Sequence, residues 1–372
     1  MSDMKVPFYG HVKQYHNLKT EIDAAISGVL ESGTYVMGPV GKRFEGELAT
    51  YIGTKHAMGV NSGTDALWLV FLALGIGKGD EVITTSNTFF ATAEAIWLVG
   101  ATPVFVDCHP LTRNIDVAKI EEKITPKTKA IVPVHLYGQC AEMDKVAEIA
   151  KKHNLMVVED CAQAIGAAGD TFKIGQHSDA VCLSFITAKN LGTFGDGGAV
   201  VTNRDDIVEP ILKMRNHGSN KRSHHSVGWN SRLDEIHAAI LSVKLKHIDS
   251  FNDARRARAA DYDEFLKDCG LKLPYQKSGY RHVYHLYVVE TPERDDLQKF
   301  LEDRGVIALT NYPIAIHQQE GFPFGLGDPH PVLPETEKNA AQCISLPIYP
   351  ELSRDEAKYV ADQVLAWVAS KK

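Results

Sequence analysis

The chain has 372 residues, of which 44% are hydrophobic and 23% charged, values typical of folded globular proteins rather than disordered or fibrous chains. Its 40 basic and 47 acidic side chains give a formal charge of −7 and are interspersed, which argues against nucleic-acid binding. No apolar run reaches the roughly 18 residues of a membrane span, and the first residues lack a signal-peptide layout, so we expect a cytoplasmic protein without a membrane partner.

Short apolar runs and helical patterns alternate through the first half of the chain. A helix over residues 19–30 and a glycine-rich break near residue 38 precede them and suggest an N-terminal arm. The apolar runs cover residues 57–60, 81–85, 102–107, 130–136, 155–159, 180–185 and 198–202. This alternation predicts an α/β fold with a mostly parallel sheet between helices, and ligands at the carboxyl ends of the strands.

The last third of the chain has a different pattern. It is helical from residue 230 to about 263, strand-like over 285–290 and helical over 294–304, followed by a glycine- and proline-rich loop and a final helix. We therefore expect a large domain, residues 1–251, and a smaller C-terminal α+β domain, residues 252–372. The basic run at residues 255–258 has acidic neighbours and is expected to lie on a solvated helix face.

Cysteine and histidine spacing does not indicate a metal site. The six cysteines are scattered without a Cys-x-x-Cys pair, and the 16 histidines show no ligand spacing. We expect buried free thiols and no metal.

Lys189 lies in a loop between the predicted strand 180–185 and a glycine-rich segment at 195–198. A partly desolvated lysine loses ammonium character, and its free amine can then condense with an aldehyde. Judged alone, however, this position is better interpreted as an ordinary surface lysine.

Asp160 and Gln163 follow the predicted strand 155–159. A carboxylate there could keep the ring nitrogen of pyridoxal 5′-phosphate (PLP) protonated, as PLP chemistry requires, and Gln163 could reach the ring hydroxyl. An equally good interpretation of Asp160 in isolation is a helix N-cap.

Two further strand ends carry suitable residues. Residues 61–66 open a helix whose backbone N–H groups, with a hydroxyl of Ser62 or Thr64, suit a phosphate, although either hydroxyl could simply cap that helix. Phe89 could stack on a flat cofactor or pack in the core. Because all these segments fall at the ends of successive predicted strands, we expect them to meet at one edge of the sheet.

Taken in order, these motifs resemble the DegT/DnrJ/EryC1/StrS sugar aminotransferases, a family of fold type I PLP enzymes. The similar segments span nearly the whole chain and comprise residues 32–35, 61–67, 79–83, 133–138, 159–163, the Lys189 loop and 230–234. The resemblance implies that Lys189 forms the Schiff base with PLP. It also implies a cofactor-binding set made up of Gly63, Thr64, Phe89, Asp160, Gln163, Ser184 and Asn230.

Within that set, the resemblance places Asp160 on the pyridine nitrogen, Phe89 on the ring, and Asn230 at the phosphate from the second subunit of a homodimer. Tyr312 and His317 match a segment that borders the substrate in similar enzymes. Packing at a domain interface is an equally good interpretation of these last two residues.

The resemblance also implies the reaction, in which an amino group passes from L-glutamate to a keto or aldehyde sugar in the biosynthesis of a surface polysaccharide or secondary metabolite. Many relatives that aminate nucleotide-linked hexoses carry an aromatic residue, a proline and a small residue where this chain has residues 186–188. A nucleotide-linked sugar and a free sugar acid therefore both stay open. Lys189 favours amine transfer, because the related dehydratases carry histidine there. The alternatives are a sugar dehydratase and a non-catalytic regulator on the same scaffold.

Overall fold

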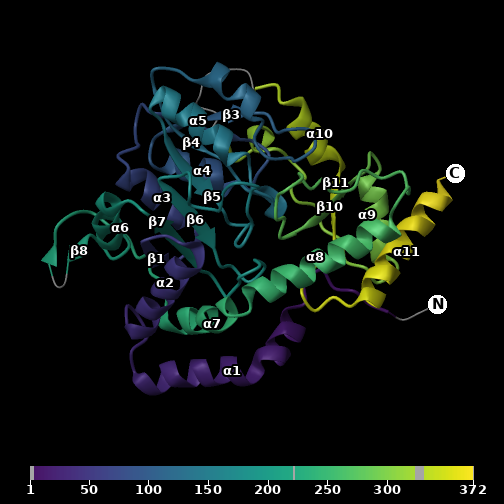
Figure 1. Ribbon diagram of the computed structural model, residues 1–372, viewed down its shortest axis with the longest axis horizontal. Helices are drawn as coiled ribbons and strands as arrows, with labels where there is room; N and C mark the ends of the chain where they lie inside the picture. The colour runs from purple at the N-terminus through teal and green to yellow at the C-terminus, as the bar shows by residue number, and fades with distance from the viewer. Residues whose placement is uncertain (1–3, 221–222, 323–330, 372) are drawn as a thin grey trace.

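The computed structural model describes residues 4–220, 223–322 and 331–371, and a seven-stranded sheet lies at its centre (Figure 1). The strands are β1 (His56–Val60), β2 (Glu81–Thr85), β3 (Thr102–Val106), β4 (Thr128–Val132), β5 (Met156–Asp160), β6 (Ala180–Ser184) and β7 (Gly198–Thr202). Their order across the sheet is β1-β7-β6-β5-β4-β2-β3. The predicted α/β fold is confirmed. One strand, β7, runs antiparallel to both its neighbours, a reversal that the sequence pattern did not indicate.

Helices cover both faces of this sheet, because successive side chains of a strand point to opposite faces. In β5, Val157 belongs to the same core as residues of α2 (Pro39–Ile52), α5 (Met143–His153) and α7 (Glu235–Leu245), whereas Val158 belongs to the core of the opposite layer. That layer comprises α3 (Gly63–Ala73), α4 (Ala91–Leu98) and α6 (Val208–Met214). Both layers are apolar and buried, which explains why the strands read as continuous hydrophobic runs.

A second, two-stranded sheet forms a separate core. It pairs β10 (Tyr287–Glu290) with β11 (Cys343–Leu346) and packs against helices that flank it in the sequence. These helices are α8 (Ile248–Phe265), α9 (Arg294–Glu302) and α11 (Arg354–Ser370). A further helix, α10 (Pro334–Gln342), directly precedes β11. The proposed boundary at residue 252 falls inside α8, which runs from beneath the main sheet to α11 (Figure 1).

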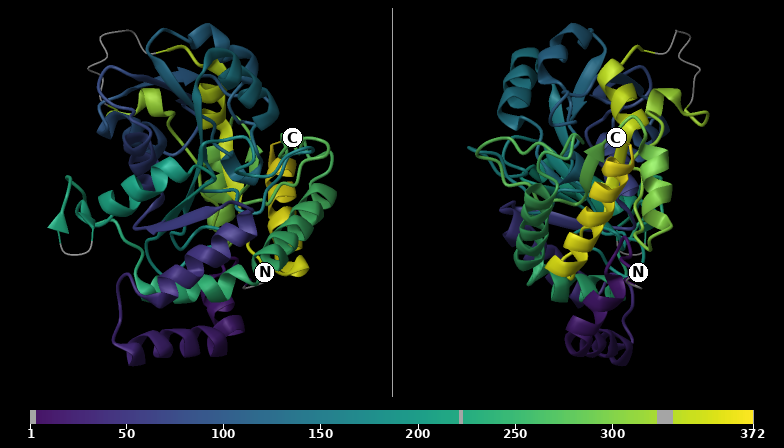
Figure 2. Two further views of the ribbon diagram at one scale, coloured as in Figure 1. Left: turned by 60° about the vertical axis from the view of Figure 1, so that its left-hand side comes forward. Right: turned by 90° about the vertical axis from the view of Figure 1, so that its right-hand side faces the viewer.

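The remaining elements lie at the periphery. Helix α1 (His11–Ser32) packs on α7 at the lower end of the molecule in both views of Figure 2. The short strands β8 (Ser219–Asn220) and β9 (Ser223–His224) pair with each other in antiparallel orientation. All six cysteines are buried free thiols, as expected. Within the described ranges, no helix is long and apolar enough to cross a bilayer.

The expected solvated face at residues 255–258 is wrong for Arg255. Its side chain is only 5% exposed, and Nη1 donates to the carbonyl oxygens of Tyr284, His285 and Ile348, the last at 2.7 Å. Burial lowers the pKa of this guanidinium to about 10, although Glu351 opposes the shift. Arg255 therefore anchors the chain that leads into β10, a role that local charge pattern does not reveal.

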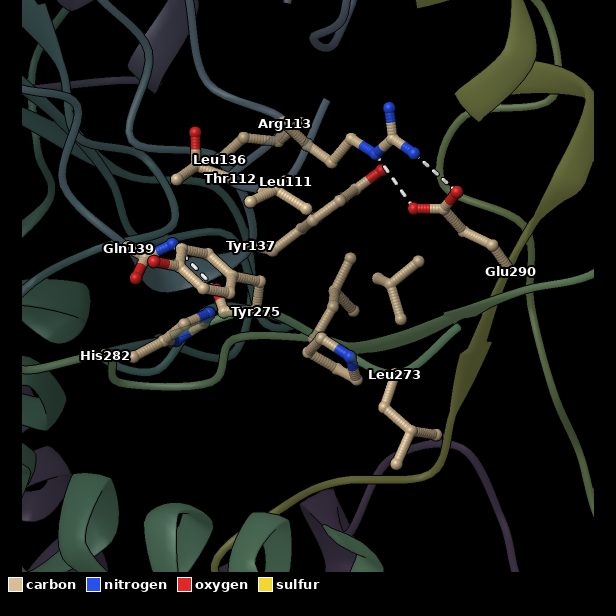
Figure 3. Close-up of a pocket in the computed structure, with 13 residues that line it drawn as sticks. Leu111, Thr112, Arg113, Leu136, Tyr137, Gln139, Leu273, Tyr275, His282 and Glu290 are labelled. Atoms are coloured by element: carbon tan, nitrogen blue, oxygen red, sulfur yellow. Dashed lines mark hydrogen bonds and ion pairs between the residues drawn. The ribbon is translucent and has the colours of Figure 1, made fainter. Parts of the chain in front are cut away.

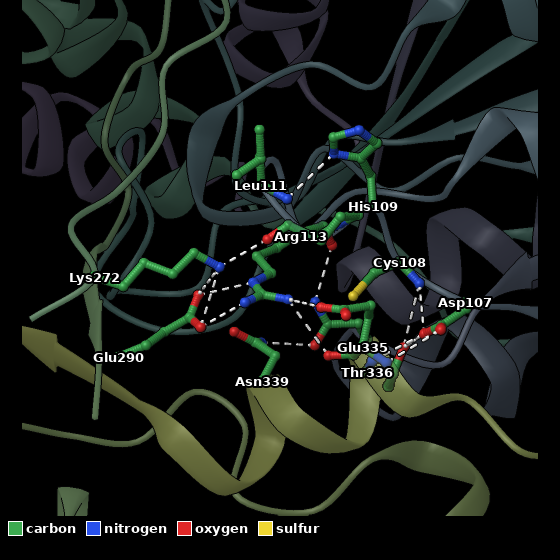
Figure 4. Close-up of polar contacts among 12 residues, drawn as sticks. Asp107, Cys108, His109, Leu111, Arg113, Lys272, Glu290, Glu335, Thr336 and Asn339 are labelled. Atoms are coloured by element: carbon green, nitrogen blue, oxygen red, sulfur yellow. Dashed lines mark hydrogen bonds and ion pairs between the residues drawn. The ribbon is translucent and has the colours of Figure 1, made fainter. Parts of the chain in front are cut away.

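A buried ion pair joins the two cores at Arg113, in the loop after β3 (Figure 4). Arg113 Nε donates to Glu290 Oε1 at 2.8 Å at the end of β10, and Nη1 lies 3.2 Å from Glu335 Oε2 in α10. Lys272 adds a second cation at 3.1 Å from Glu290. The cavity beside this cluster, shown in Figure 3, measures only about 20 Å³ and has room for little more than a water molecule.

Candidate active site

A much larger cavity, of about 310 Å³, opens at the carboxyl ends of the sheet strands. It contains eight of the ten residues that the sequence singled out, namely Gly63, Thr64, Phe89, Asp160, Gln163, Ser184, Lys189 and Tyr312. Because β7 is reversed, the residues before it, Asp196 and Gly197, also reach this edge and line the cavity. The expected convergence at the strand ends is confirmed.

Lys189 lies in the loop between β6 and β7 and lines the cavity. The surrounding protein removes water from it, and this burial lowers its pKa to about 8, although the Asp160 carboxylate opposes the shift. Gly192 permits a tight turn in the loop, since a Cβ there would lie 2.5 Å from the Thr187 carbonyl oxygen. Near pH 8 a large fraction of the Lys189 side chains is therefore neutral amine, the nucleophilic form.

Asp160 is the last residue of β5 and is 6% exposed. Its Oδ2 accepts a hydrogen bond from Thr92 Oγ1 at 2.8 Å, and its Oδ1 accepts one from the backbone N–H of Ala162 at 3.2 Å. No helix of the described chain begins here, so the helix-cap interpretation does not apply. A carboxylate oriented by two donors at the cavity wall is suited to hold a proton on a bound ring nitrogen.

Gln163 has both ends of its amide fixed. Oε1 accepts from the backbone N–H of Tyr137 at 2.6 Å, and Nε2 donates to Tyr312 Oη at 3.1 Å. The Phe89 ring lies 5.6 Å from the Tyr312 ring, measured between centroids, and is 56% exposed at the cavity rim. The rim therefore presents two aromatic faces to a flat ligand.

The N-terminus of α3 forms another part of the wall. Ser62 is the N-cap, and its hydroxyl oxygen accepts a hydrogen bond from the backbone N–H of Asp65 at 3.0 Å. The helix-capping role that the sequence allowed for Ser62 or Thr64 thus belongs to Ser62. At Gly63 the helix approaches β6 so closely that a Cβ would lie 2.8 Å from Cβ of Ser184. The backbone N–H groups of Gly63 and Thr64 stay available beside the Ser184 hydroxyl, a combination that suits a phosphate.

These three features fit PLP. Lys189 offers an amine with a lowered pKa to the aldehyde of PLP, and Asp160 offers a carboxylate to its ring nitrogen. The N-terminus of α3 offers backbone N–H groups to its phosphate. The residues that could hold the cofactor are thus present on one wall.

Two predicted residues lie elsewhere. Asn230 is exposed and does not line the cavity. His317 is 1% exposed, with Nδ1 2.8 Å from Ser86 Oγ and Nε2 3.3 Å from Glu337 Oε1. Conversely, sequence reasoning missed several lining residues, including Tyr9, Thr92, His285 and Asn311. Of these, Thr92 lies three positions after Phe89 and Asn311 directly precedes Tyr312, so both were near residues that the sequence singled out.

Comparison with known proteins gives concordant matches. The model of the DegT/DnrJ/EryC1/StrS aminotransferase family matches residues 16–365. The chain is 45% identical over 365 residues to the pleiotropic regulatory protein of Geobacillus stearothermophilus, covering 97% of this chain and 98% of that one. It is 46% identical over 365 residues to the dTDP-3-amino-3,4,6-trideoxy-α-D-glucose transaminase of Streptomyces venezuelae, covering 98% and 96% respectively. The solved structure of S. venezuelae DesV, in complex with a ketimine intermediate, superposes with a TM-score of 0.95 at 46% identity over 98% of each chain.

Proposed function

The chain belongs to the DegT/DnrJ/EryC1/StrS aminotransferase family and is a PLP-dependent sugar aminotransferase, and on this premise we propose that it transfers the amino group of L-glutamate to a nucleotide-linked keto or aldehyde sugar. The observation that carries the proposal is the placement of Lys189, whose amine has a lowered pKa and shares one cavity with Asp160 and the start of α3.

We propose the following roles for the wall residues. Gly63, Thr64 and Ser184 bind the phosphate, Asp160 pairs with the ring nitrogen, and Gln163 lies near the ring hydroxyl. Phe89 covers one face of the ring. When bound, PLP supplies an aldehyde for amines and an electron-withdrawing ring that weakens the Cα–H bond of the donor.

Lys189 then has two tasks. It holds the cofactor covalently at rest, and once displaced by the donor amine it takes the Cα proton on Nζ. The second task requires neutral Nζ, and burial favours that form by lowering the pKa to about 8. The Asp160 carboxylate lies on the cavity wall, where it can pair with the ring nitrogen and hold the proton there during the transfer.

The nucleotide-linked acceptor is supported by the dTDP-sugar named for the S. venezuelae relative. On the cavity wall, Ile186 is 44% exposed and begins the segment 186–188, where this chain departs from the aromatic-proline-small pattern. We propose that residues 186–188 contact the sugar and set its identity.

The name of the G. stearothermophilus relative favours a regulatory role. The site argues for catalysis, because a binding protein has no need of a cavity lysine with a lowered pKa opposite a carboxylate. Retention of lysine at position 189 likewise argues against dehydration.

Addition of L-glutamate alone to the PLP-loaded protein is expected to convert the absorbance of the lysine-bound cofactor to that of pyridoxamine phosphate. A nucleotide-linked keto sugar should then restore the original spectrum, since the two half-reactions are separable. Stopped-flow absorbance measures both. No spectral change with glutamate rejects the donor, and reversal by a free sugar acid but not by a nucleotide sugar rejects the acceptor.

We further propose a homodimer in which Asn230 reaches the phosphate of the partner's site. Asn230 is exposed, and apolar side chains near it are exposed as well, Val227 at 78% and Trp229 at 42%. Burial of these side chains against a second copy would remove apolar surface from water.

Complementation tests this arrangement. Asn230→Ala and Lys189→Ala are each expected to be weakly active or inactive, while subunit exchange between them should restore about one quarter of the wild-type sites, the statistical share of intact sites in a dimer. Activity after mixing, measured against each variant alone, gives the answer. An inactive mixture whose subunits have exchanged contradicts a shared site.

A further inference from the structure

His285 is a cavity residue to which the proposed chemistry assigns no task. It precedes β10, is 6% exposed, and lines the same cavity as Lys189. Its backbone carbonyl accepts a hydrogen bond from Arg255 Nη1 at 3.4 Å, which fixes the chain at this point. The hydrogen-bond partners of its ring nitrogens determine which nitrogen carries the proton.

A relay of two amides determines the proton position on the imidazole. Asn252 Nδ2 donates to the Ile165 carbonyl at 2.9 Å, so Asn252 Oδ1 faces Asn190 and accepts from its Nδ2 at 2.8 Å. The same Asn190 Nδ2 donates to the Val283 carbonyl at 3.1 Å. Because two backbone carbonyls orient the relay, Asn190 Oδ1 is the atom that lies 3.1 Å from His285 Nδ1. An amide oxygen only accepts, so Nδ1 carries the proton.

The other ring nitrogen is therefore a lone-pair acceptor. Among the residues that the structure describes, His285 Nε2 makes no hydrogen bond, and it is not one of the unpaired polar atoms sealed inside the protein. Since His285 lines the cavity and Nε2 is not sealed inside the protein, we infer that this lone pair faces the ligand space. Burial lowers the pKa of His285 well below its usual range, and the charges of Lys189 and Arg255 lower it further, so the ring stays neutral.

Resting on the proposed aminotransferase function, we propose that His285 is a positioning residue for Lys189, with Nε2 accepting a hydrogen bond from the Lys189 amine once the donor has displaced it from the cofactor. A neutral acceptor suits this task. A carboxylate would also orient the amine, but its negative charge raises the pKa of lysine, as Asp160 does, and favours the ammonium form that cannot take a proton. Imidazole adds no charge.

The sequence couples the two residues. Asn190 is the neighbour of Lys189 in the chain, so one side chain both anchors the Lys189 loop and selects the tautomer of His285. The loop that carries the nucleophile and the group that orients it are thereby fixed to the same point of α8.

The tautomer is tested first, on apo-protein labelled with ¹⁵N-histidine. The resonances that disappear in His285→Gln belong to His285, and they should report a protonated Nδ1 and an unprotonated Nε2 at neutral pH. A protonated Nε2, with or without a proton on Nδ1, overturns the proposal. This readout needs neither cofactor nor activity.

A matched pair of variants then separates positioning from support of the fold. The amide of His285→Asn can keep the donor to Asn190 but loses the acceptor at Nε2, whereas His285→Gln extends an acceptor to about the Nε2 position. We expect the glutamate half-reaction to slow by roughly 10- to 100-fold in the asparagine variant and to recover most of that loss in the glutamine variant. A merely structural histidine predicts the reverse order, which would reject the proposal. His16→Asn, at an exposed position of α1 outside the cavity, serves as a control.

Deuterium at Cα of glutamate gives the deciding measurement. If His285 orients the amine, the asparagine variant slows proton transfer itself, and the ratio of half-reaction rates with protiated and deuterated glutamate rises above that of the wild type. An unchanged ratio, with slower rates, rejects a role in proton transfer. Failure of the wild type to react with glutamate would instead contradict the proposed function, so the two failures are distinguishable.

Discussion

Replacing Lys189 with alanine is expected to lower amino transfer by at least about 10³-fold, because one side chain supplies both the nucleophile that holds the cofactor and the base that moves the Cα proton. The half-reaction with glutamate and the complete reaction should fail together. Stopped-flow absorbance after loading with PLP measures the first, and product formation with a nucleotide sugar measures the second.

The same variant should keep its fold. Because burial lowers the pKa of Lys189 from its ordinary value of 10.5 to about 8, the folded protein binds fewer protons than the unfolded chain between these pH values. The lysine thus penalises stability fully below about pH 8, and the penalty is lost as the pH rises toward 10.5. Below pH 8, apo Lys189→Ala should melt at or above the temperature of the apo wild type. Exposed Lys127→Ala is the control, and substantial turnover by Lys189→Ala would contradict the assignment.

Arg113→Met is expected to destabilise the apo-protein by about 3–5 kcal/mol, the range for breaking a buried ion pair on one side. The methionine fills much of the volume but leaves Glu290, 9% exposed, with only Lys272 as a cationic partner. The urea midpoint, followed by far-UV circular dichroism, measures the effect. Because the pair joins the two cores, the cooperativity of the transition should fall as well.

Two further variants test whether the loss of stability comes from breaking a buried ion pair. Lys358→Ala breaks an exposed pair with Asp362 on α11 and should change stability by less than about 0.5 kcal/mol. Adding Glu290→Leu to Arg113→Met removes the uncompensated charge and should recover much of the loss, since apolar replacement of a whole buried pair is often neutral. A loss below about 1 kcal/mol in Arg113→Met alone would show that the ion pair does not hold the cores together.

The main sheet was predictable from the sequence because both its faces are buried, which leaves continuous apolar runs such as those of β5 and β6. The antiparallel direction of β7 was not predictable, because an apolar run has the same composition whichever way the strand runs. Strand β11 was missed because it has four residues and follows α10 without a break. Its identity as a strand depends on pairing with β10, a segment more than fifty positions away.

In the site, too, residues near strand ends were predictable from the sequence, whereas those placed by distant segments were not. Lys189, Asp160 and the 61–66 turn lie at the end of a strand or in the loop that follows one, where topology alone brings residues together. Tyr9, Asn311 and His285 come from segments whose position depends on how the second core docks, and no local pattern encodes that docking. Arg255 shows the same limit, because its burial is decided by three carbonyl groups from distant segments.

The reversed strand β7 has a consequence for how this enzyme could change over evolutionary time. Strands β6 and β7 are antiparallel neighbours, and Ser184 pairs with Gly198. Residues 185–197 therefore form a loop whose two ends are held together by the sheet. Substitutions within such a loop, apart from Lys189 and the glycine at its turn, leave the strand register untouched, and changes in its length cost little chain entropy. On the proposed contact of residues 186–188 with the sugar, exchange of this short segment would change the acceptor, while Lys189, Asp160 and the residues proposed to bind the phosphate stay the same.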